Sequence, residues 1–219
     1  MRDARVDDMA RKLQDRLLEY GPDRLRLLLH VMRELAHGSP LTAEQVDQHI
    51  AELGIAPDAA HQFLREVTER NARDQIVGAM GLSLQDHPHR LSVAGVPLSA
   101  WCAEDTLFLP AILQQTATIE SPSPVSGQPI QLRVSPERVE DVSPASAVVS
   151  LVVVDPSREN MASVEAIWST FCSHIHFFVT RDEAERWATG RDDIAILSVD
   201  VGFAWQRPVW SEVLLATAE

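Results

Sequence analysis

Two cysteines are the strongest candidates for chemistry in this 219-residue chain, which contains no others. Cys102 is followed three residues later by Asp105. On a helical turn, positions three apart share a face with Cβ atoms about 5–6 Å apart, so the thiol and the carboxyl would be neighbours. Such a pair can bind a soft metal and move a proton. A buried small cysteine beside an aspartate at a helix N-terminus is the structural alternative.

The second cysteine, Cys172, stands in a run with His174 and His176 at alternate positions. Residues 171–179 are rich in aromatic and apolar types, which predicts a β-strand. Alternate side chains of a strand share a face, so the thiol and the two imidazoles would form one row. The row could bind a metal or carry thiol chemistry, and histidines packed in a core are the other explanation.

Charge and hydropathy exclude several classes of partner. The formal net charge is −13, from 19 Lys and Arg against 32 Asp and Glu, which opposes binding to nucleic acid or to anionic lipid. The first twenty residues hold no apolar stretch typical of a secretory signal, and the longest apolar run, Ala147–Val154, is too short to cross a membrane. We therefore expect a cytoplasmic protein with no membrane span and with reduced thiols.

The N-terminal part of the chain reads as helical. Apolar residues at helical spacing predict helices at 6–18, 23–37, 42–53 and 57–70. Thr42 and Gln45 have the spacing of a capping box. Two alternating runs, 75–84 and 90–93, then predict a hairpin, so the whole segment is typical of a winged-helix-like unit.

The C-terminal part mixes strands and helices. The sequence predicts a short helix within 101–115 that Pro110 would bend, strands at 130–134, 147–154, 171–179 and 194–199, and helical segments at 182–188 and 209–216. We expect an α+β fold, with a winged-helix-like helical domain at 1–95. It would pack on a catalytic α+β domain at 96–219, whose mixed or antiparallel β-sheet has flanking helices.

Residues 99–107 and 171–178, followed by Trp187-Ala188, closely resemble the two signature segments of the alkylmercury (organomercurial) lyases. The similarity extends over nearly the whole chain. It implies cleavage of a carbon–mercury bond by protonolysis, which yields a hydrocarbon and Hg(II). By motif, the catalytic residues of the family fall on Cys102, Asp105 and Cys172. The two thiolates would bind the mercury of substrate and product, and Asp105 would deliver the proton and be a possible further ligand.

Two positions depart from the family pattern. Ser123 stands where many members have a further cysteine, and Ser173 stands where many have a cysteine after the catalytic one. The resemblance implies that these changes affect loop stability and mercury retention rather than the reaction. It also implies an organomercurial substrate, no organic cofactor or catalytic metal, and removal of the product by small thiols or a mercuric reductase.

Elementary chemistry agrees with these residue types. Mercury is a soft cation, and thiolate is the softest ligand that a protein offers. A free thiol is only about 3% ionised at pH 7, so mercury binding must expel a proton, which an ordinary aspartate carboxylate can accept. Trp101, Phe108 and Phe177 could line a pocket for the organic group or could simply pack in the core.

Two other functions stay open at this stage. Cys102, Cys172, His174 and His176 could form a tetrahedral zinc or copper site in a metal-binding protein without lyase activity, although their spacing matches no standard finger. A metal-sensing regulator would use the winged-helix-like unit to bind DNA. The acidic residues of its recognition helix, Asp58, Glu66 and Glu69, argue against that role.

Overall fold

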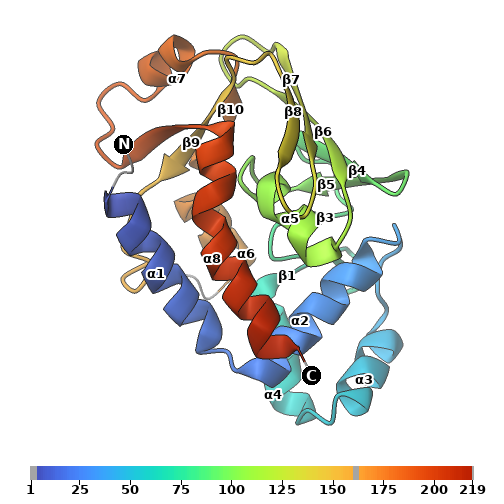
Figure 1. Cartoon of the computed structure of the whole chain (residues 1–219). Helices are drawn as coiled ribbons and strands as arrows, with labels where there is room; N and C mark the ends of the chain where they lie inside the picture. Colours follow the sequence, from blue (N-terminus) through green and yellow to red (C-terminus); the bar gives the residue numbers. More distant parts are fainter. Residues whose placement is uncertain (1–3, 160–162, 219) are drawn as a thin grey trace.

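Four helices precede the first strand, as the sequence predicts (Figure 1). The computed structural model, which describes residues 4–159 and 163–218, places them at α1 (Ala4–Leu18), α2 (Pro22–Leu35), α3 (Ala43–Glu52) and α4 (Pro57–Val67). Pro22 and Pro57 begin α2 and α4, where a missing backbone N–H costs nothing. The capping box of Thr42 and Gln45 forms at the start of α3.

An eight-stranded antiparallel sheet follows, in the order β1-β2-β3-β5-β4-β6-β7-β8. Its strands are β1 (Thr68–Arg70), β2 (Ile76–Ala79), β3 (Leu82–Ser83), β4 (His89–Val93), β5 (Val96–Ala100), β6 (Ala117–Pro122), β7 (Pro129–Val134) and β8 (Val139–Ser143). Along β6 and β7 every second residue is buried, so one face of this part of the sheet is turned to the core and the other to solvent.

The structure corrects the N-terminal prediction in three places. The supposed recognition helix 57–70 ends at Val67, and its last residues form β1. The run 75–84 is not one strand, because Met80 and Gly81 have positive φ angles and reverse the chain between β2 and β3. The predicted hairpin does not form either, since β3 pairs with β5 and not with β4.

The large sheet also extends across residue 95, the predicted domain boundary. β4 and β5 lie on either side of residue 95 and pair antiparallel from His89 with Ala100 to Val93 with Val96. The division into 1–95 and 96–219 stays a prediction. What the pairing does establish is that Ala100, two residues before Cys102, is anchored in the centre of the sheet, between β3 and β4.

The C-terminal part contributes a three-stranded sheet and four of the helical elements. The sheet has the order β10-β9-β11, with β9 (Val148–Val152), β10 (Phe177–Phe178) and β11 (Ile194–Ser198). The helical elements are α6 (Val164–Thr170), the 3-10 turn η1 (Cys172–His174), α7 (Arg181–Trp187) and α8 (Val199–Thr217). Between β5 and β6 of the large sheet lies α5 (Asp105–Leu113), which keeps Pro110 inside the helix. β9 is buried along its whole length, as its apolar run predicts.

One prediction for this part is wrong, and another gives too short a helix. Residues 171–179 form a strand only at Phe177 and Phe178, and Cys172 lies in the 3-10 turn. The amphipathic stretch 209–216 is only the second half of α8, which begins at Val199 and continues through Pro208.

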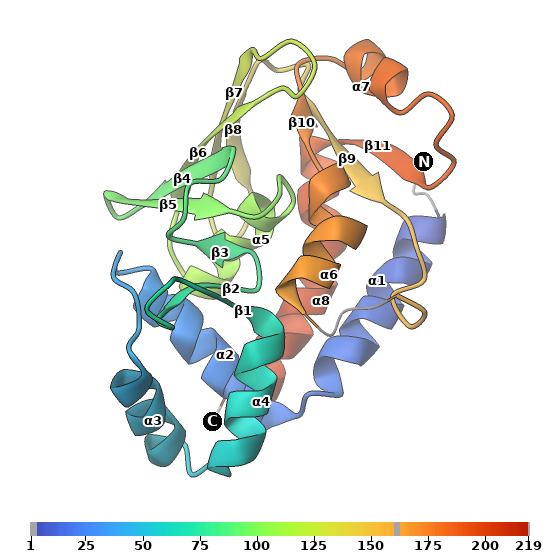
Figure 2. The same ribbon diagram turned by 180° about the vertical axis from the view of Figure 1, so that it is seen from behind.

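Helix α8 crosses the molecule beside α1, and both views show them side by side (Figure 1, Figure 2). Its buried residues Phe203, Val209 and Val213 join the same apolar core as Val6 and Met9 of α1. α8 also packs against α5, which begins at the first cysteine motif. Within the described ranges, none of the helices combines the length and the apolar character that a membrane span requires.

The buried histidine of β4 gives the fold a specific pH dependence. His89 is 2% exposed, and its Nδ1 lies 2.8 Å from Ser121 Oγ. Burial, followed by the charges of His176 and His87, lowers the pKa of His89 to about 3. In the unfolded chain a histidine has a pKa of about 6.5, so between these values the unfolded state binds a proton that the folded state does not. The contribution of His89 to the free energy of unfolding is therefore fully present above pH 6.5 and is lost as the pH falls.

We expect His89→Gln to flatten this dependence, because glutamine has no proton to bind and can still pair with Ser121. In the variant, the change of the free energy of unfolding with pH should be smaller by about 1.4 kcal/mol per pH unit. Urea unfolding of both proteins at several pH values between 6.5 and 4.5 measures it. Parallel curves would show that His89 does not carry the effect.

Candidate active site

Three short segments bring the predicted site residues together. Cys102 follows the end of β5, Asp105 is the first residue of α5, and Cys172 opens η1 directly after α6. A backbone hydrogen bond of 3.2 Å from Ala103 N–H to the Ile175 carbonyl holds the two cysteine segments side by side. Residues 70 positions apart in the sequence therefore meet through the sheet and through this bond.

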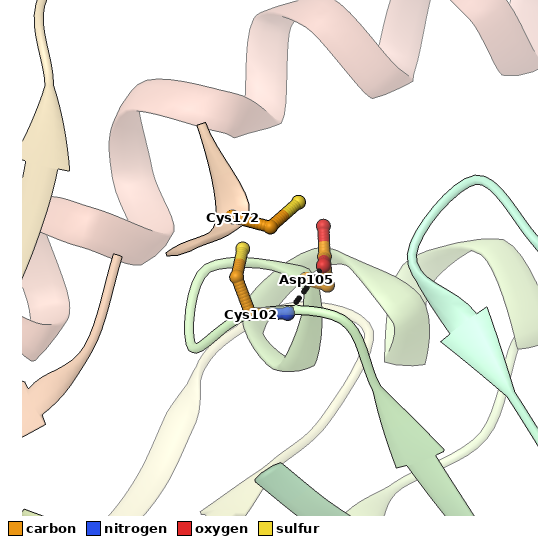
Figure 3. Close-up of side chains that lie close together, drawn as sticks. All are labelled: Cys102, Asp105 and Cys172. Carbon is orange, nitrogen blue, oxygen red and sulfur yellow. Dashed lines mark hydrogen bonds between the residues drawn. The ribbon is translucent and has the colours of Figure 1, made fainter. Parts of the chain in front are cut away.

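The two Sγ atoms and a carboxylate oxygen of Asp105 all lie within 4.8 Å of one another. Figure 3 shows the three side chains gathered together, with the Cys172 sulfur directed to the side of the Asp105 carboxyl. The Cys102 backbone N–H donates a 2.8 Å hydrogen bond to Asp105 Oδ2, which fixes the carboxylate at the start of α5. All three side chains are almost fully buried.

A glycine makes room for this carboxyl. Gly81, between β2 and β3, has φ +94°, and a Cβ added there would lie 2.6 Å from Asp105 Cγ. Its carbonyl accepts a 2.9 Å hydrogen bond from Trp101 N–H, so the turn also holds the residue before Cys102. Both the space and the backbone conformation require glycine at this position.

Burial sets the protonation of the site. It raises the pKa of Asp105 to about 6, against the smaller opposing effect of hydrogen bonds from Cys102. Burial, the hydrogen bond to Cys172 and the charge of Asp105 raise the pKa of Cys102 well above its usual value. The hydrogen bond with Cys102 lowers the pKa of Cys172, but burial and Asp105 outweigh it, so that pKa is raised as well. Both thiols are thus protonated at neutral pH, beside a carboxyl of which about a tenth is protonated at pH 7.

An apolar cavity of about 120 Å³, partly open to solvent, adjoins the three side chains. Its walls include Trp101, Phe108 and Trp210 and, from α1, Met9, Leu13 and Leu17. Of the three aromatic residues for which the sequence left a pocket or the core open, Trp101 and Phe108 line the cavity. Phe177 does not, because it is fully buried in the core at β10. The part of the cavity contributed by α1 and α8 had no signal in the sequence beyond ordinary amphipathic spacing.

Sequence reasoning missed one acidic residue of the site. Glu104 is 3% exposed, lines the cavity and accepts a 3.2 Å hydrogen bond from Trp205 Nε1. Gln206 Nε2 donates to its other carboxylate oxygen. Burial raises the pKa of Glu104 to about 8, although these hydrogen bonds lower it. The available signal was an acidic pair, Glu104-Asp105, directly after the cysteine.

The two histidines do not form a row with Cys172, because the chain turns as a 3-10 helix there and not as a strand. His174 Nδ1 lies 3.0 Å from Arg191 Nη1, and His176 Nε2 lies 3.0 Å from the Ser173 carbonyl. Across the part of the chain that the structure describes, the potential metal ligands that gather in a group of three are Cys102, Asp105 and Cys172. Neither histidine belongs to this group, so the proposed tetrahedral site of two cysteines and two histidines is wrong.

The two serines that depart from the family pattern have different surroundings. Ser123 is 2% exposed, and its hydroxyl donates a 2.9 Å hydrogen bond to Glu183 Oε1. Ser123 Oγ itself accepts hydrogen bonds from the backbone N–H groups of Val125 and Ser126. Ser173 only donates to the carbonyl of Ser169. A serine hydroxyl thus ties down the loop after β6.

We expect Ser123→Ala to lower the free energy of unfolding by about 1–3 kcal/mol, because it leaves buried polar partners without their hydrogen bond. The matched change Ser173→Ala should cost less than about 0.5 kcal/mol at its more exposed position. Chemical unfolding of both variants measures the difference. Equal stabilities would mean that Ser123 does not hold the loop.

Comparisons with known proteins agree with this geometry. Residues 82–208 match the family model described as alkylmercury lyase. An alkylmercury lyase of Streptomyces lividans is 36% identical over 84% of this chain and 81% of its own length. One from Staphylococcus epidermidis is 37% identical over 81% of this chain and 78% of its own.

A crystal structure described as the mercury-bound form of MerB2 superposes with a TM-score of 0.78. It covers 94% of this chain and 98% of that chain at 23% identity, which shows a shared fold and bears out the predicted α+β class. The family model covers more than half of the chain, and relatives above 30% identity cover most of it. The chain therefore belongs to the alkylmercury lyase family.

Proposed function

We propose that this protein is an organomercurial lyase that cleaves the carbon–mercury bond by protonolysis, with Cys102, Cys172 and Asp105 as the reacting groups. The observation that carries the proposal is the meeting of two buried thiols and a buried carboxyl within 4.8 Å beside an apolar cavity. Thiols suit mercury, the carboxyl suits proton transfer, and the cavity suits an organic group.

The reaction balances with these groups alone. For a substrate R–Hg–X, one cysteine sulfur replaces X on mercury, and the proton of that thiol leaves with X as HX. The second sulfur then binds mercury, and its proton passes to Asp105. The carboxyl donates this proton to the carbon as the carbon–mercury bond breaks. The products are R–H, HX and Hg(II) bound by two thiolates.

The environment of Asp105 supports its role in both halves of the proton transfer. A pKa of about 6 leaves most of the carboxyl ionised at pH 7, ready to accept the proton of a thiol that binds mercury. The same pKa is closer to the working pH than that of an exposed aspartate, so the protonated form is a more accessible proton donor. The hydrogen bond from Cys102 N–H keeps the carboxylate near both sulfurs throughout.

We propose that no organic cofactor or resident metal takes part, because the substrate brings the metal and the three side chains supply ligands and proton. Hg(II) on two buried thiolates would leave by exchange with small thiols, with a mercuric reductase as a possible final acceptor. A cytoplasmic location would keep both cysteines reduced and supply those thiols.

A direct assay tests the function. The reduced protein is incubated with a phenylmercury or methylmercury salt and excess small thiol, and benzene or methane is measured by gas chromatography. We expect repeated turnovers above a control with thiol alone. Hydrocarbon at the level of that control would contradict the proposal.

A further inference from the structure

Ser150 is a fully buried polar residue that takes no part in the reaction described above. It interrupts strand β9, whose other residues are valine and leucine. β9 is the central strand of the small sheet, between β10 and β11, so its backbone is held from both sides. A hydroxyl at such a position needs hydrogen-bond partners. These partners lie in the segment that follows Cys172.

Both the backbone and the side chain of Ser150 bind this segment. The Ser150 backbone N–H donates a 3.0 Å hydrogen bond to the His176 carbonyl. In a regular antiparallel pair, the His176 N–H would donate to the Ser150 carbonyl in return. Here it donates to Ser150 Oγ at 2.9 Å, and the hydroxyl donates to the His174 carbonyl at 2.9 Å. The side chain thus takes the place of a backbone partner where the pairing of β9 with β10 gives way to the turn η1.

These hydrogen bonds tie Cys172 to the small sheet. His174 is the last residue of η1 and Cys172 is the first, so the carbonyl that Ser150 holds lies one short turn from the cysteine. The other cysteine is anchored separately, because Cys102 follows β5 of the large sheet. A mercury atom bound by both sulfurs therefore joins segments that are fixed to different sheets. The distance between the two sulfurs depends on what holds each cysteine to its own sheet.

We propose that Ser150 is a positioning residue, whose hydroxyl holds the turn that bears Cys172 so that both sulfurs bind one mercury atom. This inference rests on the proposed two-sulfur reaction. Ser150 does not line the cavity, so it acts through the turn and not on the substrate. Without the hydroxyl, the bond from Ala103 N–H to the Ile175 carbonyl still keeps the cysteine segments together, but less firmly. A displacement of about 1 Å can slow a reaction roughly 100-fold.

Ser150→Thr and Ser150→Val test the positioning role, because their side chains have nearly the same shape and differ in the hydroxyl. Two quantities are measured: the affinity for Hg(II), by competition with a small dithiol, and hydrocarbon release from phenylmercury. Ser150→Val should lower the Hg(II) affinity and kcat by roughly 10- to 100-fold, the loss typical of a residue that orients a metal ligand. KM should change little, since one sulfur suffices to capture the substrate. Ser150→Thr should retain most of both quantities.

Ser135→Ala is the matched control for Ser150→Ala. Ser135 is 5% exposed, and its hydroxyl also joins backbone groups: it donates to the Arg138 carbonyl and accepts from the N–H groups of Glu137 and Arg138. It lies between β7 and β8 and does not line the cavity. Both changes remove buried hydrogen bonds, so both should lower the melting temperature. Only Ser150→Ala should weaken Hg(II) binding and hydrocarbon release, whereas a merely structural role of Ser150 would leave the Hg(II) affinity of the two variants equal.

The outcomes separate this inference from the proposed function. Equal Hg(II) affinity and equal kcat in Ser150→Thr and Ser150→Val would overturn the positioning role, and the lyase function would stand. If the added methyl group prevents both variants from folding, Ser150→Ala against Ser135→Ala carries the test, and equal Hg(II) affinities there refute the inference. If the wild-type protein releases no hydrocarbon, the lyase function fails. The Hg(II) affinities then still decide whether Ser150 positions Cys172.

Discussion

Replacement of either Cys102 or Cys172 by alanine is expected to abolish hydrocarbon release, with a loss of about 10³-fold or more. One sulfur can anchor mercury, but the proposed reaction needs a second sulfur that binds the same metal and supplies the proton for the carbon. The two Sγ atoms are close enough for one mercury atom to bridge them. Neither variant retains a second cysteine that could substitute, since the chain has only two.

Single-turnover release of benzene from phenylmercury measures this loss, with circular dichroism and thermal unfolding as checks that the variants fold. Ser173→Ala is the matched control: it changes a small side chain beside Cys172 that donates only to a neighbouring carbonyl. It should retain wild-type release. Turnover close to wild type in Cys102→Ala or Cys172→Ala would refute the two-thiol reaction.

Local signals in the sequence predicted much of the helical part correctly. Proline in the first turn, a capping box and apolar residues at helical spacing each act within a few residues, so they specify α1 to α4 without knowledge of the rest of the fold. The apolar run of β9 likewise predicts a buried central strand. The residues around the cysteines and the aspartate were similar enough to the signature segments of the family to indicate it.

The errors lie where long-range pairing decides the structure. Residues 171–179 have strand-like composition, yet Ser150 accepts the backbone N–H of His176, and Ile175 pairs with Ala103, so distant partners fix this segment as a turn and a very short strand. The break at Met80-Gly81 also depends on a tertiary contact, because the carboxyl of Asp105 occupies the space that a side chain at position 81 would need. Neither partner is visible in the local sequence.

The protonation of the site depends on burial, which the sequence could not supply. An aspartate with its ordinary pKa near 3.9 is a proton acceptor and a poor donor at pH 7. In the fold, α1, α8 and the segment around Cys172 enclose Asp105 and raise its pKa to about 6. The same enclosure buries Glu104, whose burial the local sequence does not indicate.

Asp105→Asn should reduce hydrocarbon release by about 10²–10⁴-fold, the loss typical of a missing general acid or base. Mercury binding should persist. Asparagine has nearly the same size, and its carbonyl oxygen can still accept the Cys102 N–H, so the fold at the start of α5 should survive. It cannot accept the proton of a thiol or return it to carbon. Retained mercury and released benzene are to be measured on the same sample.

The pH dependence separates proton transfer from a purely structural role of Asp105. Above a pH of about 6 the carboxylate is ionised and can accept the thiol proton as mercury binds. As the pH falls through 6 the carboxyl becomes protonated, so the rate at which the second thiol captures Hg(II) should fall in the wild-type protein. Asp105→Asn should lack this acid limb, which stopped-flow absorbance of the mercury–thiolate bond can follow. An unchanged acid limb in the variant, or a joint loss of mercury binding and hydrocarbon release, would make Asp105 a ligand or a structural residue instead.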